Sequence, residues 1–201
     1  GIAKLYSHQA AAVNAVAAGE HIVVVTPTAS GKTLCYNLPV LDALARDPAG
    51  RALYLFPTKA LSRDQLAAVQ AFPVPVTAGV YDGDTPDEEK LAIREEAQIV
   101  LSNPDMLHLG ILPNHLKWHS FFRNLRFVVI DELHAYRGVF GTNVAHILRR
   151  LQRICSHYGS EPQFILSSAT IANPQEHARR LTGVPVTLID DNGAPQGERC
   201  F

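Results

Sequence analysis

Residues 21–33 read His-Ile-Val-Val-Val-Thr-Pro-Thr-Ala-Ser-Gly-Lys-Thr, and this stretch decides the fold. An apolar run at residues 21–25 leads into a turn that ends in Gly31-Lys32-Thr33, and an amphipathic helical pattern follows. A backbone that turns tightly before a helix directs several N–H groups at one point, where the helix dipole also favours anions. The stretch therefore predicts a strand, a phosphate-binding loop and a helix, and with them an ATP site.

The loop supplies the residue types that a nucleotide needs. Lys32 is placed to reach the terminal phosphates, and the Thr33 hydroxyl is placed to bind Mg²⁺. The loop residues that we expect to contact ATP are Thr26, Pro27, Thr28, Ala29, Ser30, Gly31, Lys32 and Thr33. Because Gly-Lys-Thr also occurs by chance, the assignment needs a second site.

A pair of acids far downstream supplies that second site. Asp131-Glu132-Leu133-His134 follows the apolar run at residues 126–130. An acid at the end of a buried strand is costly without a partner, and Mg²⁺ would supply one. We expect Asp131 to bind the ion through its water shell and Glu132 to polarise the water that attacks the γ-phosphate. Asp-Glu alone would also suit a solvated turn, but the phosphate loop favours the catalytic interpretation.

Short apolar runs alternate with helical patterns along the chain, which is typical of a parallel α/β fold. The predicted strands are residues 21–25, 51–56, 74–80, 98–101, 126–130, 163–166 and 185–189. The predicted helices are residues 7–18, 32–46, 60–71, 86–96, 104–111, 142–157 and 174–182. Consecutive apolar residues at 22–25, 127–130 and 164–166 predict central strands that are covered by helices on both faces.

Three predicted helices begin with a polar residue that is followed by proline. These pairs are Thr85-Pro86, Asn103-Pro104 and Asn173-Pro174. A side-chain oxygen at such a position accepts a hydrogen bond from the first helical turn, and proline fits the first helical position. We therefore expect Thr85, Asn103 and Asn173 to cap these helices.

The composition excludes some classes of protein. The chain has 201 residues, of which 47% are hydrophobic, and a formal net charge of −1, so any contact with nucleic acid must be local. Cys35, Cys155 and Cys200 have no Cys-x-x-Cys spacing, which favours a reducing compartment over a structural zinc site. No apolar run is long enough to span a bilayer. We expect no membrane contact and a cytoplasmic protein, in the bacterial cytosol or nucleoid or in a eukaryotic nucleus.

Six motifs in order resemble the first RecA-like domain of superfamily-two helicases of the DExH-box type. The loop and the Asp131-Glu132-Leu133-His134 segment are two of them. The others are residues 5–9 (Q motif), 57–61 (motif Ia), 102–105 (motif Ib) and 168–170 (motif III). The resemblance implies a RecA-like P-loop domain with a mostly parallel sheet of about seven strands and helices on both faces, and ATP hydrolysis that drives translocation.

The resemblance also assigns roles by motif. It implies that Gln9 reads the adenine edge. Nucleic acid would contact Thr58, Lys59, Ser102 and Asn103. Coupling of the ATP site to the nucleic acid and to another domain would involve His134, Ser168, Ala169 and Thr170. Taken singly, the hydroxyl and amide residues would also suit simple caps.

Residues 81–86, 131–141 and 191–195 resemble more narrowly the helicases of the YprA (MrfA) type, relatives of the fungal and plant RecQ-four-like enzymes. The resemblance to that group implies 3′-to-5′ unwinding of DNA in DNA repair, with single-stranded or forked DNA as the partner. In the family a second RecA-like domain of the same chain completes the ATP site with arginines. We expect residues 1–190 to form the first such domain and residues 191–201 to begin a linker to the second.

Three alternatives remain open at this point. An RNA helicase shares the backbone-contacting motifs, and a nucleotide-gated clamp would bind nucleic acid without translocating. A small-molecule P-loop kinase would leave motifs Ia and III unexplained. Two features have no assigned role: a basic helical face with Arg149, Arg150 and Arg153, and the pair His115 and His119, for which packing is favoured over a metal site.

Overall fold

A computed structural model describes residues 4–27 and 30–193 of the chain. Seven strands form one sheet in the order β3-β4-β2-β5-β6-β1-β7, and every neighbouring pair is parallel. The strands are β1 Ile22–Val25, β2 Arg51–Leu55, β3 Ala78–Val80, β4 Ile99–Ser102, β5 Leu125–Ile130, β6 Gln163–Ser168 and β7 Thr187–Ile189. The predicted α/β class is confirmed, and β1, β5 and β6 each have a neighbour on both sides, as expected.

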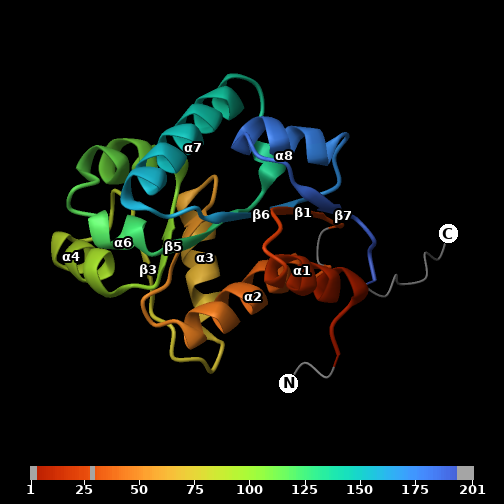
Figure 1. Ribbon diagram of the computed structural model, residues 1–201, viewed down its shortest axis with the longest axis horizontal. Helices are drawn as coiled ribbons and strands as arrows, with labels where there is room; N and C mark the ends of the chain where they lie inside the picture. The colour runs from red at the N-terminus through yellow and green to blue at the C-terminus, as the bar shows by residue number, and fades with distance from the viewer. Residues whose placement is uncertain (1–3, 28–29, 194–201) are drawn as a thin grey trace.

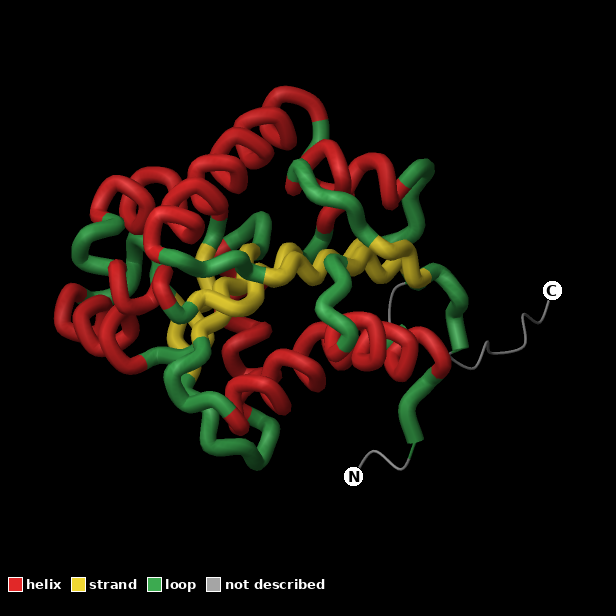
Figure 2. Tube along the Cα trace, in the orientation of Figure 1, coloured by secondary structure: helices red, strands yellow, loops and turns green. Residues whose placement is uncertain are grey.

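Helices cover both faces of the sheet (Figure 1, Figure 2). Helices α1, α2 and α3 lie on one face, and α7 and α8 lie on the other, with α6 packed against α7. The helices are α1 Ser7–Ala17, α2 Lys32–Arg46, α3 Lys59–Gln70, α4 Asp87–Glu96, α5 Pro104–Met106, α6 His119–Arg123, α7 Gly138–Tyr158 and α8 Pro174–Thr182.

The continuous apolar runs are explained by two cores, one on each face. In β1, Val23 and Val25 pack on the α7 side, whereas Ile22 and Val24 pack on the α1 and α2 side. Strand β5 alternates in the same way, because successive side chains of a strand point to opposite faces. Full burial of each such side chain contributes about 1.5–3 kcal/mol, so the central strands hold the two helical layers together.

The region around residues 104–123 differs from the prediction. The single helix expected over residues 104–111 is a short α-helix followed by the π-helix η1 Leu107–Ile111 and the 3-10 helix η2 Leu112–Asn114. Helix α6 was not predicted, because it has only five residues and no helical period can be recognised over so short a segment. Buried Trp118, Phe121 and Phe122 anchor it.

Two of the three predicted caps are wrong. The Asn103 side chain accepts a hydrogen bond from Met106 N at 2.8 Å and caps α5, as predicted. Thr85 does not cap α4; its hydroxyl instead bonds to Val80 O and to Asp82 within the preceding turn. Asn173 makes no side-chain cap, because its backbone is left-handed with φ 49°. Local turn geometry decides how the side chains of Thr85 and Asn173 are used.

The structure also bears on the cysteines and on membrane contact. Cys35 and Cys155 are buried free thiols, and burial raises the pKa of each to about 12. Cys200 lies outside the described residues. Over the described residues, no helix combines the length and the apolar character that crossing a bilayer requires.

Gly141 is required where α7 begins. A Cβ at this position would lie 2.3 Å from the Tyr136 carbonyl oxygen, a backbone atom that cannot move alone. We expect Gly141→Ala to lower the free energy of unfolding by about 2 kcal/mol, the usual cost of overpacking. Urea denaturation would measure the change. Gly83→Ala is the matched control, since the nearest atom to a Cβ added there is the side-chain Nζ of Lys59, at an ordinary contact distance of 3.5 Å. Equal effects of the two substitutions would contradict this explanation.

Candidate nucleotide and nucleic-acid site

The predicted site residues gather at one edge of the sheet. Because all strands are parallel, the segments that follow β1, β2, β4, β5 and β6 emerge at the same edge, where α/β sheets bind ligands. These segments carry the phosphate loop, motif Ia, motif Ib, the acids at 131–132 and motif III. The topology therefore brings together residues that lie far apart in the sequence.

The phosphate loop has the geometry of an anion site. Gly31 adopts the left-handed region with φ 79°, and α2 begins at Lys32, so the first N–H groups of the helix face the loop. Lys32 Nζ donates to the carbonyl oxygens of Thr26 at 2.9 Å and Pro27 at 3.0 Å. The hydroxyls of Thr26 and Ser30 lie 2.6 Å apart. Thr28 and Ala29, which were also predicted to contact ATP, lie outside the described residues.

Helix α1 holds this loop through two consecutive residues. Gln9 Nε2 donates to Gly31 O at 3.2 Å, and Gln9 Oε1 accepts from Tyr6 N at 3.0 Å. His8 Nε2 lies 3.0 Å from Ser30 O, and because a carbonyl only accepts, this nitrogen carries the proton. Glycine is favoured at position 31 by its left-handed φ of 79°, and a Cβ there would also displace the Gln9 amide, whose Nε2 would lie 2.6 Å away. Gln9 reaches the loop as its motif suggests, and its role towards adenine stays a prediction.

His8 was missed by the sequence analysis. It is fully buried, stacks on Tyr6 with ring centroids 5.9 Å apart, and leaves Nδ1 without a hydrogen-bond partner among the described residues. The only signal in the sequence was its position beside Gln9 at the start of a helix. Together, His8 and Gln9 fix two consecutive carbonyls of the phosphate loop.

The Asp131 carboxylate is held by three parts of the chain. Its Oδ2 accepts from Tyr36 Oη of α2 at 3.1 Å, and its Oδ1 accepts from the Glu132 backbone N–H at 2.8 Å and from the Ser167 hydroxyl of β6. The cost of a partly buried acid, which we expected Mg²⁺ to offset, is therefore already offset by hydrogen bonds within the chain. Neither Tyr36 nor Ser167 was predicted, because helix α2 and strand β6 meet Asp131 only in the folded sheet.

Tyr36 joins helix α2 to Asp131, the residue that directly follows β5. Burial, and then the negative charge of Asp131, raise the pKa of the Tyr36 hydroxyl, and a hydrogen bond with Thr33 opposes the shift. The Tyr36 hydroxyl also lies 3.1 Å from Gln65 of α3. Tyr36 therefore places Thr33 and Asp131, the two predicted Mg²⁺ ligands, in one hydrogen-bonded group.

Glu132 and His134 form a strained pair beside this group. Glu132 has φ 53°, a left-handed conformation that costs a non-glycine residue about 1–3 kcal/mol. Its Oε2 lies 3.1 Å from His134 Nδ1, within ion-pair distance but without hydrogen-bond geometry. Strain of this kind commonly occurs at functional sites.

The motif III residues divide between the interior and the surface. Ser168 is fully buried, and its hydroxyl has no hydrogen-bond partner among the described residues. Ala169 is half-buried and Thr170 is exposed. Ser167, which the sequence analysis left outside this group, makes the direct bond to Asp131.

The predicted nucleic-acid contacts already have partners within the chain. Thr58 Oγ1 caps α3 by accepting from Leu61 N, and Lys59 Nζ lies 2.9 Å from Asp84 Oδ2. A hydrogen bond from Lys59, and then the positive charge of Lys59, lower the pKa of Asp84. The Ser102 hydroxyl donates to Tyr81 O at 2.6 Å and is fully buried. The Asn103 side-chain oxygen is used as a cap and its backbone carbonyl accepts from Leu107 N at 2.9 Å, so its side-chain amide nitrogen remains for a ligand.

Other conspicuous residues have structural explanations. His115 Nδ1 lies 2.8 Å from the Tyr158 hydroxyl, and His119 Nδ1 lies 3.0 Å from Leu116 O. Within the described part of the chain, no group of three or more His, Cys, Asp or Glu residues could hold a metal ion. Tyr136 is fully buried and stacks on Phe140; burial, and then the charges of Asp131 and Glu132, raise its pKa.

Comparison with known proteins identifies the family. The model of the DEAD/DEAH box helicase family matches residues 6–177. The chain belongs to this helicase family. It is 56% identical to the uncharacterized ATP-dependent helicase YprA of Bacillus subtilis, over 100% of this chain and 27% of that protein. It is 44% identical to the ATP-dependent helicase HRQ1 of Saccharomyces cerevisiae, over 96% of this chain and 19% of that protein.

Solved helicase structures share the fold. A crystal structure of the DUF1998 helicase MrfA bound to DNA matches with a TM-score of 0.95 and 57% identity, over 98% of this chain and 29% of that one. A structure of MrfA bound to DNA and AMPPNP matches with a TM-score of 0.94, over 98% of this chain and 28% of that one. The chain spans less than a third of the length of these relatives.

The Ser167 bond to Asp131 gives a test of the site. We expect Ser167→Ala, in the full-length protein, to lower the kcat of ATP hydrolysis by about 10- to 100-fold, because the loss of a hydrogen bond to a charged group is worth about 1.5–3 kcal/mol. A steady-state phosphate-release assay would measure it. Ser160→Ala is the matched control, since Ser160 donates to Phe122 O away from the site. Wild-type turnover in both variants would show that the Asp131 bond is not used in catalysis.

Proposed function

We propose that this chain is the ATP-binding motor domain of an ATP-dependent DNA helicase. The observation that carries the proposal is the hydrogen-bonded group in which Tyr36 and Ser167 join Asp131 to the phosphate-loop helix and to the end of β6, directly before Ala169. A group of this kind links nucleotide-contacting and coupling elements, which a motor requires. The match to DNA-bound MrfA over 98% of the chain supports the same proposal.

ATP would bind at the phosphate loop. The residues proposed to hold it are Gln9 at adenine and Thr26, Pro27, Thr28, Ala29, Ser30, Gly31, Lys32 and Thr33 at the phosphates. The Lys32 ammonium bonds to two loop carbonyls at the position where phosphate oxygens would be held. Phosphate oxygens would give this ammonium charge-assisted bonds, which are about twice as strong as neutral ones.

Hydrolysis would use the two acids in different roles. Thr33 and Asp131 would hold Mg²⁺ together with phosphate oxygens and water, and the ion would neutralise charge on the phosphates. Glu132 carries its carboxylate away from the bonds that occupy Asp131, so it is available to orient and polarise the attacking water. His134, at 3.1 Å from Glu132, would sense this step and couple it to the rest of the protein.

Nucleic acid would cross the edge formed by motifs Ia and Ib. We assign this contact to Thr58, Lys59, Ser102 and Asn103, through side chains and backbone N–H groups at the helix starts. Ser168, Ala169 and Thr170 would couple it to the ATP site. A second RecA-like domain would supply the arginines that complete hydrolysis, with residues 1–190 as the first domain and residues 191–201 as the start of the linker.

The finer assignment follows from the YprA and MrfA resemblance. We propose translocation in the 3′-to-5′ direction on single-stranded or forked DNA, in DNA repair, within the cytosol, the nucleoid or a nucleus. RNA is the alternative substrate, since contacts to phosphates distinguish the two nucleic acids poorly. Unwinding of matched DNA and RNA duplexes by the full-length protein would separate the two substrates.

Substitution of Lys32 or Glu132 tests the catalytic assignment. In the full-length protein, we expect Lys32→Ala and Glu132→Gln each to lower DNA-stimulated ATP turnover by about 100-fold or more, the usual cost of removing a group that stabilises the transition state. Glu132→Gln should still bind AMPPNP, because it removes the water-polarising group only. Lys117→Ala, an exposed lysine away from the site, is the control.

Two results would contradict the assignment. Wild-type turnover in either variant would remove that residue from catalysis. Turnover in the wild-type protein that no nucleic acid stimulates would instead favour a nucleotide-gated clamp that does not translocate.

The 201-residue chain alone should bind ATP weakly and unwind nothing. The proposed arginines of the second domain are needed in the family to stabilise the charge that develops during phosphoryl transfer. A strand-displacement assay on a forked DNA, with the full-length protein as the positive control, would measure this. Robust unwinding by the 201 residues would disprove the requirement for a second domain.

A further inference from the structure

A groove lies beside the motif Ib segment, outside the residues assigned so far. It has a volume of about 550 Å³ and runs between helix α7 and the segment formed by α5 and η1. We call it the α5–α7 groove. Its lining includes Asp105 and His108 on one side and His146, Arg149, Arg150 and Arg153 on the other. One acid therefore faces three arginines.

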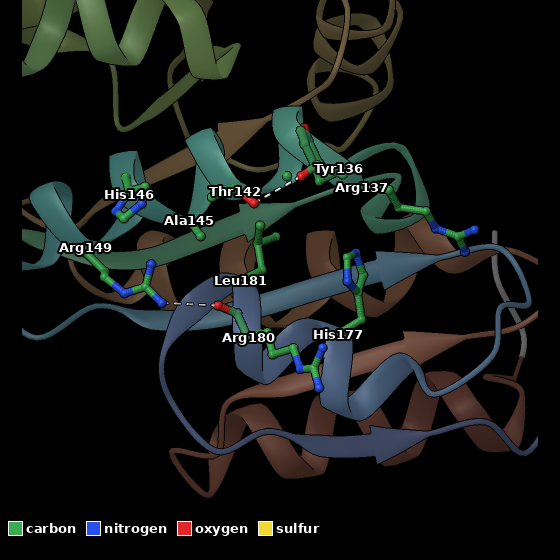
Figure 3. A pocket seen from close by; sticks show the side chains of 11 residues that line it. Tyr136, Arg137, Thr142, Ala145, His146, Arg149, His177, Arg180 and Leu181 are labelled. Carbon is green, nitrogen blue, oxygen red and sulfur yellow. Dashed lines mark hydrogen bonds between the residues drawn. The ribbon is translucent and has the colours of Figure 1, made fainter.

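These arginines are not neutralised within the described residues. Arg149, Arg150 and Arg153 make no ion pair there. The one bond found is from Arg149 to the Arg180 carbonyl oxygen at 3.5 Å, across to α8 (Figure 3). Helix α3 differs, because Lys59 of motif Ia and Arg63 lie close to Asp82 and Asp84. A chain with a net charge of −1 thus concentrates unpaired positive charge along one face of α7.

The positive face extends beyond this groove. A neighbouring hollow of about 540 Å³ between α7 and α8 shares His146 and Arg149 with it and adds Arg137 and Arg180 (Figure 3). In Figure 3 the Arg149 side chain reaches from α7 towards α8, and the His177 side chain points from α8 towards the start of α7. Glu176 pairs with Arg180 and offsets the charge only at that end.

The position of the groove indicates which kind of ligand it binds. Helix α5 begins directly after Asn103, so the groove starts where motif Ib ends. From His146 to Arg153 it follows α7 for about 10 Å, at 1.5 Å per residue. A linear row of guanidinium groups suits phosphates, which arginine binds in a bidentate manner. An acidic protein surface would match the charge but not the continuity with motif Ib.

We propose that the α5–α7 groove binds the phosphodiester backbone of a single nucleic-acid strand that continues from motif Ib, with Arg150 and Arg153 as the phosphate contacts. Arg149 serves mainly to join α7 to α8, since its guanidinium already bonds to the α8 backbone. The contact reads charge and not bases, so it adds affinity without sequence preference. The inference rests on the proposed function, because it extends the strand path assigned to Asn103.

The test compares two double variants of the full-length protein. Arg150→Ala with Arg153→Ala removes the proposed contacts and leaves the Arg149 bond intact. Lys117→Ala with Arg123→Ala removes the same charge from exposed residues at and before α6, next to the opposite edge of the sheet. Fluorescence anisotropy with a labelled 20-nucleotide oligothymidylate would give the dissociation constant at several NaCl concentrations, with AMPPNP present. Thermal melting would establish that both variants are folded.

We expect the groove variant to bind the oligonucleotide at least tenfold more weakly. The slope of the logarithm of the binding constant against the logarithm of the NaCl concentration should be shallower by about 1.4. Two phosphate contacts are lost, and each contributes about 0.7 to this slope on a single strand. The control should stay within about twofold of wild type.

Several outcomes would overturn the proposal. Wild-type affinity and slope in the groove variant would do so, as would weaker binding with an unchanged slope. A lower melting temperature with unchanged DNA binding would also overturn it, and would show that the two arginines stabilise the fold instead. Failure of the wild-type protein to bind the oligonucleotide would overturn the proposed function as well, whereas failure of the groove alone leaves the motif Ib contact standing.

Discussion

The hydrogen bonds to the Asp131 carboxylate are the interaction on which the site depends. A partly buried charge is tolerated only when its oxygens are satisfied, and here the partners come from α2, from β6 and from the next backbone N–H. This requirement fixes the phosphate-loop helix and the end of β6 against the end of β5. A change at any of the three segments must therefore alter the environment of Asp131 and Glu132.

The parallel sheet makes it possible for these segments to come together around Asp131. Since every strand runs in the same direction, each strand delivers its following loop to one edge, and the spacing of the strands sets the spacing of the functional segments. Helix α1 then restrains the phosphate loop through His8 and Gln9. Strain at Glu132 is supported because the surrounding sheet and the 3-10 helix η3 Leu133–Ala135 hold its backbone.

The positive side chains of this nearly neutral protein differ in whether acidic side chains pair with them. The cations of motif Ia are paired with acids of the segment after β3, whereas those along α7 are unpaired among the described residues. Pairing of exposed cations contributes little stability and weakens their attraction for phosphates. The unpaired row on α7 is therefore the stronger site for a polyanion, although motif Ia carries the recognisable sequence pattern.

The sequence by itself determined the α/β class, all seven strands, the interior position of β1, β5 and β6, and the turn from β1 into α2, because hydrophobic period and turn chemistry are local properties. It did not determine the broken helix after motif Ib, helix α6, or the uses of Thr85 and Asn173, where local backbone geometry overrides the pattern. Only the tertiary structure brought Tyr36, Ser167 and His8 to the site and placed the α7 arginines beside motif Ib. Each of these contacts joins residues distant in sequence, and their distances are set by how the strands pack in the sheet.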